Sequence, residues 1–273
     1  MSLAHAVVTA DGATPDRSVL FLHGILGSGA NWRGFARRLV TAHPEWAAVL
    51  VDLRMHGDSQ HEAPPHTVAR AADDLVVLER TLSAPVSAVI GHSFGGKVAL
   101  AYAAERGASL SRLYVLDSTP GARPDAAGSE GTVAVVEMLS QVATTVFPTR
   151  RDFVEQLTGL GQSRVMADWL AMSLAPAEGG VRLRFDMGAI RALLADYFAR
   201  DLWPVIESPP GDLVCHVVLG GRSSVFSSDD RARLFAIESS SGGRVHAHVL
   251  PDAGHWVHVD DPDGLFAVIS GSL

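Results

Sequence analysis

The feature that most constrains the fold is a series of short apolar runs that alternate with segments of helical periodicity. Strands that are apolar on both faces are typical of a parallel sheet covered by helices. The nearly continuous apolar runs are residues 18–22, 47–51, 86–90, 113–116, 213–220 and 245–250. Between the second and third runs, residues 66–82 place their apolar side chains on one helix face. The pattern therefore predicts an α/β fold.

A long helical segment interrupts this alternation. From about residue 119 to 203 the strand pattern fades, and amphipathic helices are expected instead, with Val135, Met138, Leu139, Val142 and Val146 at helical spacing. Strand patterns then resume, and a last helix is expected from about Asp261. We therefore predict a core formed by residues 1–118 and 206–273, with a helical cap inserted at 119–205.

The composition is that of a folded chain and argues against several kinds of partner. Hydrophobic residues make up 47% and charged residues 19% of the chain, and 22 Lys+Arg against 30 Asp+Glu give a net charge of −8. Without a basic run, a nucleic-acid partner is not expected. No apolar segment is long enough to span a bilayer and no signal peptide is recognisable, so we expect no membrane partner and a cytoplasmic location. Cys215 stands alone in an apolar run and is expected to be an inert core residue.

The sequence GHSFGG at residues 91–96 follows the third apolar run and precedes a helical stretch. It matches G-x-S-x-G, a tight turn between strand and helix that exposes a serine hydroxyl as a nucleophile. Gly91 and Gly95 are needed where side chains would collide with neighbouring elements, and the helix N-terminus favours a developing oxyanion. Ser93 is therefore the predicted nucleophile, and His92 is predicted to be structural.

A second loop is expected to complete the oxyanion site. The sequence HGILGS at residues 23–28 directly follows the first apolar run. An acyl-transfer site needs two N–H donors for the oxyanion. We assign them to Phe94 and Ile25, with Leu26 as the alternative to Ile25.

The general base is expected late in the chain, on the loop PDAGHWVH at residues 251–258 that follows the last apolar run. His255 is the predicted base and His258 the competitor. His246 and His248 share one face of a strand and could imitate a metal pair. Because no third ligand group is visible, no metal is predicted.

The acid is less sharply defined. The sequence LGGRSS at residues 219–224 offers serines after the penultimate apolar run, where such enzymes often carry an aspartate. Asp117 ends the run after the one that precedes Ser93, where a carboxylate could reach His255 and stabilise its imidazolium. Asp117 is the favoured acid, with Asp229 and Asp230 as alternatives.

These motifs together resemble the α/β-hydrolase superfamily over nearly the whole chain, and within it the small bacterial esterase and acyl-thioesterase branch with a helical cap. The segments that carry the resemblance are HGILGS at 23–28, DLRMHGDS at 52–59, GHSFGGK at 91–97 and GHWVH at 254–258. The resemblance implies a mostly parallel eight-stranded sheet flanked by helices, a Ser-His-Asp triad with Asp117 as acid, and no cofactor. It also suggests that Asp52 and Arg54 brace loops near the site. Ser93 excludes the chemistry of the similar haloalkane dehalogenases and epoxide hydrolases, which need an aspartate there.

The expected function is hydrolysis of a carboxylic ester or thioester of a small to medium apolar acyl group through an acyl-enzyme on Ser93. A simple ester comes first, because the cap lacks a basic cluster for coenzyme A phosphates. Leu26, Met138, Trp169 and Trp256 are the predicted substrate contacts. Further cap residues, which either line an acyl pocket or pack, are Phe147, Met166, Met172 and Trp203. The alternatives are a carbon–carbon bond hydrolase, a cofactor-free oxygenase with the same triad, or a non-catalytic binder of a small ligand.

Overall fold

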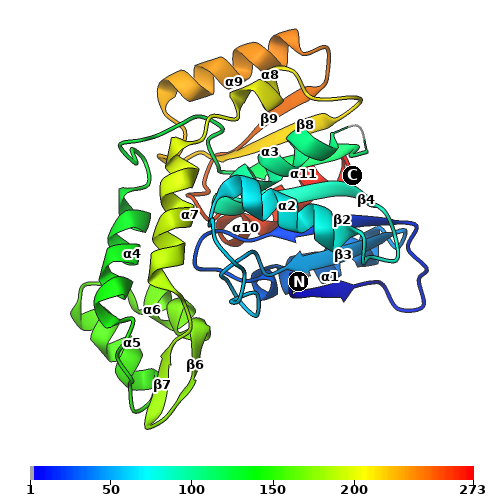
Figure 1. The fold of residues 1–273 in the computed structure, drawn as a ribbon. Helices are drawn as coiled ribbons and strands as arrows, with labels where there is room; N and C mark the ends of the chain where they lie inside the picture. Colours follow the sequence, from blue (N-terminus) through cyan, green and yellow to red (C-terminus); the bar gives the residue numbers. More distant parts are fainter. Residues whose placement is uncertain (1–2, 108) are drawn as a thin grey trace.

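A twisted sheet of seven strands forms the centre of the protein, whose computed structural model describes residues 3–107 and 109–273 (Figure 1). In spatial order the strands run β1-β3-β2-β4-β5-β8-β9. Their bounds are β1 (His5–Val8), β2 (Arg17–Leu22), β3 (Trp46–Val51), β4 (Val86–His92), β5 (Arg112–Leu116), β8 (Val214–Gly220) and β9 (Val245–Leu250). β1 is antiparallel to β3, and every other neighbouring pair is parallel. The six strands predicted from apolar runs are all present.

The expected count of eight strands is wrong, because the central sheet has seven among the described residues. The number eight came from the family resemblance, whereas the sequence itself shows six apolar runs. The seventh strand, β1, lies at the edge of the sheet and was not predicted. Three of its four residues are exposed, so it has no apolar run to reveal it.

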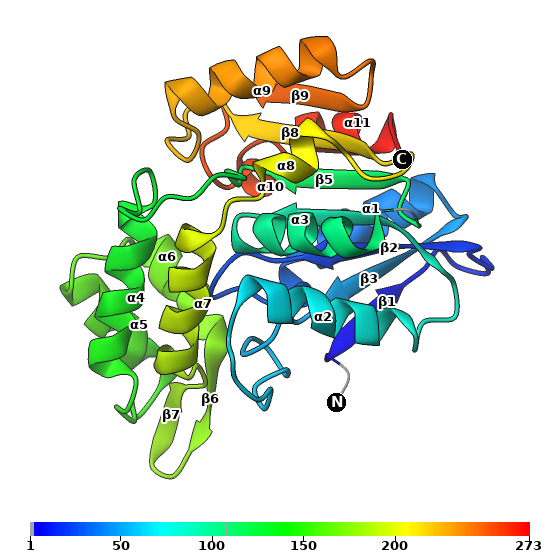
Figure 2. The ribbon, with the colours of Figure 1, turned by 45° about the horizontal axis from the view of Figure 1, so that its top comes forward.

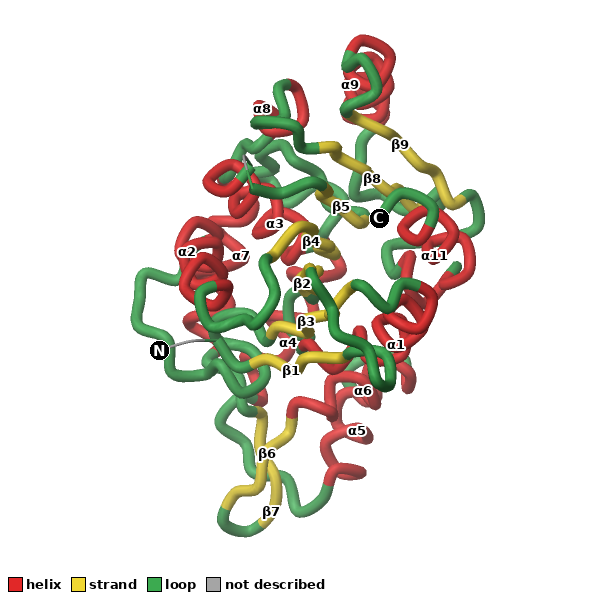
Figure 3. Tube along the Cα trace, turned by 90° about the vertical axis from the view of Figure 1, so that its right-hand side faces the viewer, coloured by secondary structure: helices red, strands yellow, loops and turns green. Residues whose placement is uncertain are grey.

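Helices cover both faces of the sheet, as Figure 3 shows end-on. α2 (Val68–Glu79) and α3 (Phe94–Arg106) lie on one face, and α1 (Arg33–Ala42) and α11 (Pro262–Ser270) lie on the other. The remaining elements of the core are η1 (Gly29–Trp32), α9 (Ser228–Ser240) and α10 (Val257–Asp260). Successive side chains of a strand point to opposite faces, so Leu20 and Phe21 of β2 belong to different apolar clusters.

The chain between β5 and β8 leaves the sheet and forms a separate lobe beside it (Figures 1 and 2). Its elements are α4 (Glu130–Val142), α5 (Arg150–Gly159), α6 (Arg164–Leu170), η2 (Ala171–Ser173), β6 (Leu174–Ala177), β7 (Gly180–Leu183) and α7 (Met187–Ala199). The short helix that follows, α8 (Trp203–Glu207), lies over the core beside α3 (Figure 2). The β6–β7 hairpin was not expected in a helical segment. Its strands have four residues each, too few for a clear alternating pattern. Val146, expected on a helix, lies beyond α4 and is 41% exposed.

A buried lysine ties the inserted lobe to the helix that follows Ser93. Lys97 of α3 is fully buried, and its Nζ donates to the carbonyl oxygens of Gly121, Tyr197 and Arg200 at 2.8, 2.6 and 3.0 Å. These carbonyls come from both ends of the lobe. Burial lowers the pKa of Lys97 to about 7. The three carbonyls thus hold both connections of the lobe against the helix that carries the predicted nucleophile.

The segment after β3 braces the loops next to the sheet, as the resemblance suggested. The Asp52 carboxylate accepts from the N–H of Gly29 at 2.8 Å and from that of Asp58 at 2.9 Å. Arg54 is fully buried and makes a two-pronged ion pair with Asp74 of α2, at 2.7 and 3.0 Å. These contacts fix the loop after β3 against the loop after β2 and against α2.

Candidate active site

Ser93 occupies a strained turn between β4 and α3. Its φ of 53° and ψ of −119° lie in a region that residues other than glycine rarely adopt. A Cβ on Gly91 would lie 2.1 Å from the carbonyl oxygen of Gly95, and one on Gly95 would lie 2.6 Å from that of His23. Both positions therefore require glycine, and the turn can form only with this pattern of residues.

The structure brings the three predicted catalytic side chains into one chain of hydrogen bonds. The Ser93 hydroxyl lies 3.1 Å from Nε2 of His255, and Nδ1–H of His255 donates to Oδ2 of Asp117 at 2.7 Å. His255 is partly exposed, with 28% of its side chain accessible, whereas the Asp117 side chain is fully buried. In this arrangement Nε2 of His255 can take a proton from Ser93, and Asp117 holds the imidazole in the tautomer required for that step.

Asp117 is held by two further donors besides His255. Its Oδ1 accepts the backbone N–H of Gly220 at 3.0 Å, and its Oδ2 accepts the hydroxyl of Ser223 at 2.5 Å. Asp117 itself has a φ of 43°, so the backbone turns sharply to aim the carboxylate. Ser223 comes from the segment in which the sequence showed serines instead of an acid. The sequence analysis did not assign it a role, and the structure makes it a partner of the carboxylate.

The alternative acids lie away from this site. Asp230 caps α9 by accepting from Ser227, and it makes an ion pair with Arg123. Asp229 is exposed in the first turn of the same helix. Among residues 3–107 and 109–273, the side-chain hydrogen bonds of His255 go to Ser93 and Asp117 and not to either of these aspartates.

Two other histidines surround His255. Nε2–H of His92 donates to the carbonyl oxygen of His255 at 2.8 Å, which agrees with a structural role for His92. His258, the competing base, packs its ring against Trp32 with centroids 4.6 Å apart. Burial lowers the pKa of His258 to about 4 and that of His92 well below its usual value, so both are neutral near pH 7. Neither of them hydrogen-bonds to Ser93 among the described residues.

A reciprocal pair of buried histidines braces the predicted oxyanion loop. Nε2 of His56 accepts the N–H of Leu26 at 3.1 Å, and Nε2 of His23 accepts the N–H of Leu53 at 3.1 Å. Each ring donates from Nδ1, His23 to the Gly24 carbonyl oxygen and His56 to that of Arg54. Burial lowers the pKa of His23 to about 4 and that of His56 to about 3, so both rings are neutral acceptors near pH 7. The sequence analysis missed these two roles, since nothing local in the chain pairs the rings with donors 30 residues away.

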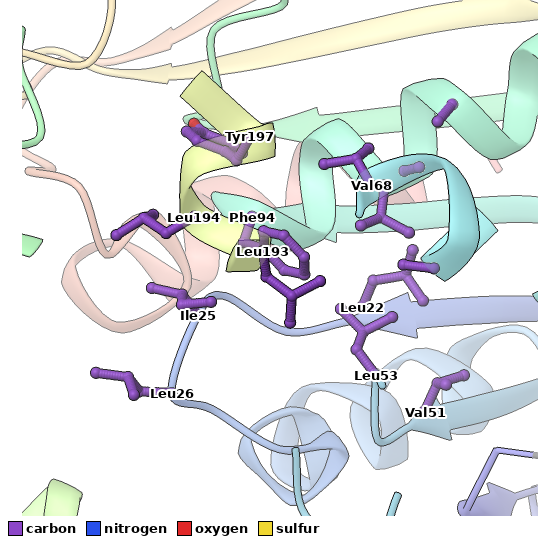
Figure 4. Packing of buried hydrophobic residues seen from close by; sticks show 14 of the residues in the cluster. Leu22, Ile25, Leu26, Val51, Leu53, Val68, Phe94, Leu193, Leu194 and Tyr197 are labelled. Atoms are coloured by element: carbon purple, nitrogen blue, oxygen red, sulfur yellow. The ribbon is translucent and has the colours of Figure 1, made fainter. Parts of the chain in front are cut away.

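This brace also determines which of the two candidate oxyanion donors on the loop, the N–H of Ile25 or that of Leu26, is available to a substrate. Leu26 has a φ of 65°, and its N–H is already bonded to His56. Among the described residues, no hydrogen bond occupies the N–H of Ile25. Phe94 begins α3, so its N–H has no acceptor within the helix. The free donors are thus those of Ile25 and Phe94. Figure 4 shows Ile25 and Leu26 on the loop after β2, and Phe94 and Leu193 in the same apolar cluster.

A cavity of about 460 Å³ opens at Ser93 and His255. Leu26, Trp169 and Trp256, three of the four predicted substrate contacts, line it. The fourth, Met138, is not among the residues that line this cavity: its side chain is 8% exposed and packs in the apolar cluster, on the buried side of α4. Val135, one turn earlier on that helix, lines the cavity instead.

The other apolar side chains of the lobe divide between lining and packing. Met166 lines the same cavity as Ser93, and Met172 lines a second cavity beside it. Phe147 and Trp203 line neither and are buried at 6% and 2% exposure. An amphipathic pattern cannot make this distinction, because both kinds of residue avoid water.

Several side chains outside the site have structural surroundings. The rings of His246 and His248 of β9 stack on the ring of His216 of β8. Within residues 3–107 and 109–273, no group of three or more His, Cys, Asp or Glu side chains is arranged to hold a metal ion. Cys215 is buried, and burial raises the pKa of its thiol to about 12. In the described part of the chain, no helix has the length and apolar character needed to cross a membrane.

Comparison with known proteins identifies the family of the chain. Residues 19–268 match the model of the alpha/beta hydrolase family. The chain is 28% identical over 254 residues to an sn-1-specific diacylglycerol lipase of Danio rerio, covering 92% of this chain and 77% of the lipase. It is 26% identical over 270 residues to the esterase YbfF of Escherichia coli K12, covering 98% of both. A solved esterase from a marine microorganism superposes with a TM-score of 0.82 at 22% identity, covering 100% of this chain and 99% of that one. The chain belongs to the alpha/beta hydrolase family.

Proposed function

We propose that the protein hydrolyses carboxylic esters by two-step acyl transfer through an acyl-enzyme on Ser93. The observation that carries the proposal is the hydrogen-bond chain from Ser93 through His255 to Asp117, at 3.1 and 2.7 Å. Similarity to proteins named esterase and lipase supports ester hydrolysis in general.

In the first step, Nε2 of His255 takes the proton of the Ser93 hydroxyl while Oγ forms a bond to the ester carbonyl carbon. The N–H groups of Phe94 and Ile25 stabilise the negative charge that develops on the carbonyl oxygen. When the bond to the alcohol breaks, His255 donates its proton to the departing oxygen. The products of this step are the free alcohol and an ester between Ser93 and the acyl group.

In the second step, water attacks the acyl-enzyme and His255 takes a proton from it. Collapse of the second intermediate releases the carboxylic acid, and the proton returns to Ser93. Throughout both steps Asp117 remains ionised and stabilises the imidazolium, with the N–H of Gly220 and the hydroxyl of Ser223 holding it in place.

The cavity supports an apolar acyl group of small to medium size as the substrate. Its volume of about 460 Å³ lies within the range of small-molecule sites. Its apolar walls come from the oxyanion loop, from the inserted lobe and from the loop of His255. The residues that form these walls are Ile25, Leu26, Val135, Met166, Trp169 and Trp256.

The test is hydrolysis of p-nitrophenyl esters from acetate to decanoate by the wild type and by Ser93→Ala. We expect a burst of p-nitrophenol from the wild type, none from Ser93→Ala, and a chain-length optimum that reports the size of the cavity. A fluorophosphonate probe should add its mass to Ser93. Ser240→Ala, on the exposed face of α9, is the matched control and should behave as the wild type.

Three outcomes would contradict the proposal. Esterase activity that persists in Ser93→Ala would exclude the acyl-enzyme on Ser93. No turnover on any ester, with Ser93 still labelled by the fluorophosphonate, would favour carbon–carbon cleavage or oxygenase chemistry on the same side chains. If no ester were hydrolysed and Ser93 were not labelled, a ligand-binding role would be favoured.

A further inference from the structure

The cavity at the nucleophile is polar on one side and apolar on another. Its polar side includes Ser129 and Thr132 from the first turn of α4 and Ser224 from the loop after β8. These two segments lie together, because the hydroxyl of Ser224 donates to the carbonyl oxygen of Gly128 at 3.4 Å. Most of the apolar lining comes from the loop after β2, from α6 and from the loop after β9, and its members are Ile25, Leu26, Met166, Trp169 and Trp256. An acyl chain is therefore expected to lie along these apolar side chains, where it loses contact with water.

Trp169 lies at the boundary between this cavity and a second one. The second cavity has a volume of about 320 Å³, and the residues that line both cavities are Leu26, Gly27, Asn31 and Trp169. The first three belong to the core, on the loop after β2 and on η1. Trp169 is the shared residue that comes from the lobe, on α6. Its indole therefore closes the boundary from the side of the lobe.

Contacts on both sides hold this indole in place. The rings of Trp169 and Trp256 meet edge to face, with centroids 4.9 Å apart and planes at 83°. Trp256 directly follows His255, so the contact joins the lobe to the loop that carries the base. The helix of Trp169 is itself fixed, because Arg150 of α5 donates to the carbonyl oxygen of Asp168 at 2.8 Å. The indole is thus a fixed wall of the cavity and not a freely rotating side chain.

Space continues behind the indole. Ala30 of η1 and Met172 of η2 line only the second cavity, together with charged side chains such as those of Arg33 and Asp58. An acyl chain that passed Trp169 would have room to extend and apolar side chains to contact there. Replacement of the indole by a smaller side chain would therefore connect the two cavities.

We propose that Trp169 is the specificity-determining residue that limits the length of the acyl chain. The inference rests on the proposed ester hydrolysis at Ser93 and names the side chain that sets its chain-length optimum. Each methylene that packs along the apolar lining should improve the reaction until the chain reaches the indole. A longer chain must bend back towards the polar side of the cavity or displace the indole from Trp256, and both cost binding energy. The substrate class is therefore an ester of a short to medium linear acid.

The test compares the wild type with Trp169→Ala on p-nitrophenyl esters from acetate to tetradecanoate, at concentrations below micelle formation. Up to the wild-type optimum, each added methylene should raise kcat/KM by at most about fourfold. In Trp169→Ala the optimum should move to a longer chain. Relative to the wild-type optimum ester, the ester two carbons longer should gain about tenfold in kcat/KM. Trp169→Phe should give a smaller shift, because a benzene ring fills more of the boundary than a methyl group does.

Two further variants make the test specific. Ala30 is exposed on η1 and lines only the second cavity, so Ala30→Phe should fill that cavity. Alone it should keep the wild-type chain-length profile, and combined with Trp169→Ala it should restore the shorter optimum. Val165→Ala is the matched control, because Val165 lies on the same helix as Trp169, is 81% exposed and lines neither cavity. Circular dichroism verifies that each variant is folded.

A chain-length profile that is the same in folded Trp169→Ala as in the wild type would overturn the inference. So would a longer optimum that persists when Ala30→Phe is added to Trp169→Ala, because the longer chain would then lie outside the second cavity. Failure of the proposed function itself gives a different result, since the wild type would then hydrolyse none of these esters in a Ser93-dependent way.

Discussion

Replacing His56 by leucine tests whether the histidine brace holds the oxyanion loop. The variant keeps a buried side chain of similar size but removes the acceptor of the Leu26 N–H and the donor to the Arg54 carbonyl oxygen. Leu26 has a φ of 65°, a conformation that costs a residue other than glycine roughly 1–2 kcal/mol. The hydrogen bond to His56 is the contact that offsets this strain.

The magnitude follows from that balance. Loss of a buried hydrogen bond with one partner left unpaired costs about 1–3 kcal/mol. A shift of this size lowers the population of the competent loop by about 5- to 150-fold, since each 1.4 kcal/mol is about a factor of ten. Because the adjacent peptide carries the N–H of Ile25, kcat should fall by about that factor with a small change in KM. Removal of one oxyanion donor costs a comparable or larger factor.

The assay is steady-state hydrolysis of a p-nitrophenyl ester, together with the affinity for a trifluoromethyl ketone that imitates the tetrahedral intermediate. Both kcat and the affinity for the ketone should fall in parallel in His56→Leu. His56→Gln can still accept from Leu26 and should recover a large part of the loss. His216→Leu, at another buried histidine far along the chain, is the matched control for stability and should keep kcat. If folded His56→Leu kept kcat within about threefold of the wild type, the brace would have no part in positioning the loop.

Three further outcomes follow from the structure. Asp117→Asn should lower kcat by about 10⁴-fold without unfolding the protein, and a near-normal rate on p-nitrophenyl esters would exclude Asp117 as the acid. Ser223→Ala, which removes a donor to the buried Asp117 carboxylate, should lower the free energy of unfolding by about 1–2 kcal/mol in urea titrations, and an unchanged midpoint would count against that bond. Acid should destabilise the fold between pH 6.5 and about 4, because burial lowers the pKa of His23 to about 4. In this range the unfolded chain binds a proton at His23 that the folded chain does not bind, so the free energy of unfolding falls by about 1.4 kcal/mol per pH unit for each such histidine. A urea midpoint that stays constant from pH 6.5 to 4 would contradict this prediction.

Most of the fold could be predicted from local sequence patterns, because burial on both faces of a parallel sheet requires continuous apolar runs in the chain. Each of the six runs became a strand, and the helix expected over 66–82 is α2. The failures occur where burial is incomplete or elements are short. β1 is an exposed edge strand, and β6 and β7 have four residues each. Neither situation produces a periodic pattern long enough to recognise.

Within the site, the sequence alone determined those residues whose roles depend on their neighbours along the chain. The turn at Ser93 requires Gly91 and Gly95 because a Cβ at either position would collide with backbone atoms. The nucleophile turn can therefore be recognised from the sequence of residues 91–96 alone. The position of His255 after the last strand follows in the same way, because the carboxyl ends of parallel strands meet at one edge of the sheet.

Only the tertiary structure decided which distant groups meet. The sequence left Asp117, Asp229 and Asp230 open, and the pairing of β5 with β8 places Asp117 beside Gly220 and Ser223. It also separated Met138, which packs, from residues that line the cavity. The physical reason is that hydrogen bonds and cavity walls depend on the distance between side chains in space. Local periodicity specifies which side of an element is buried, but the packing of whole elements sets which side chains come within 3 Å of one another.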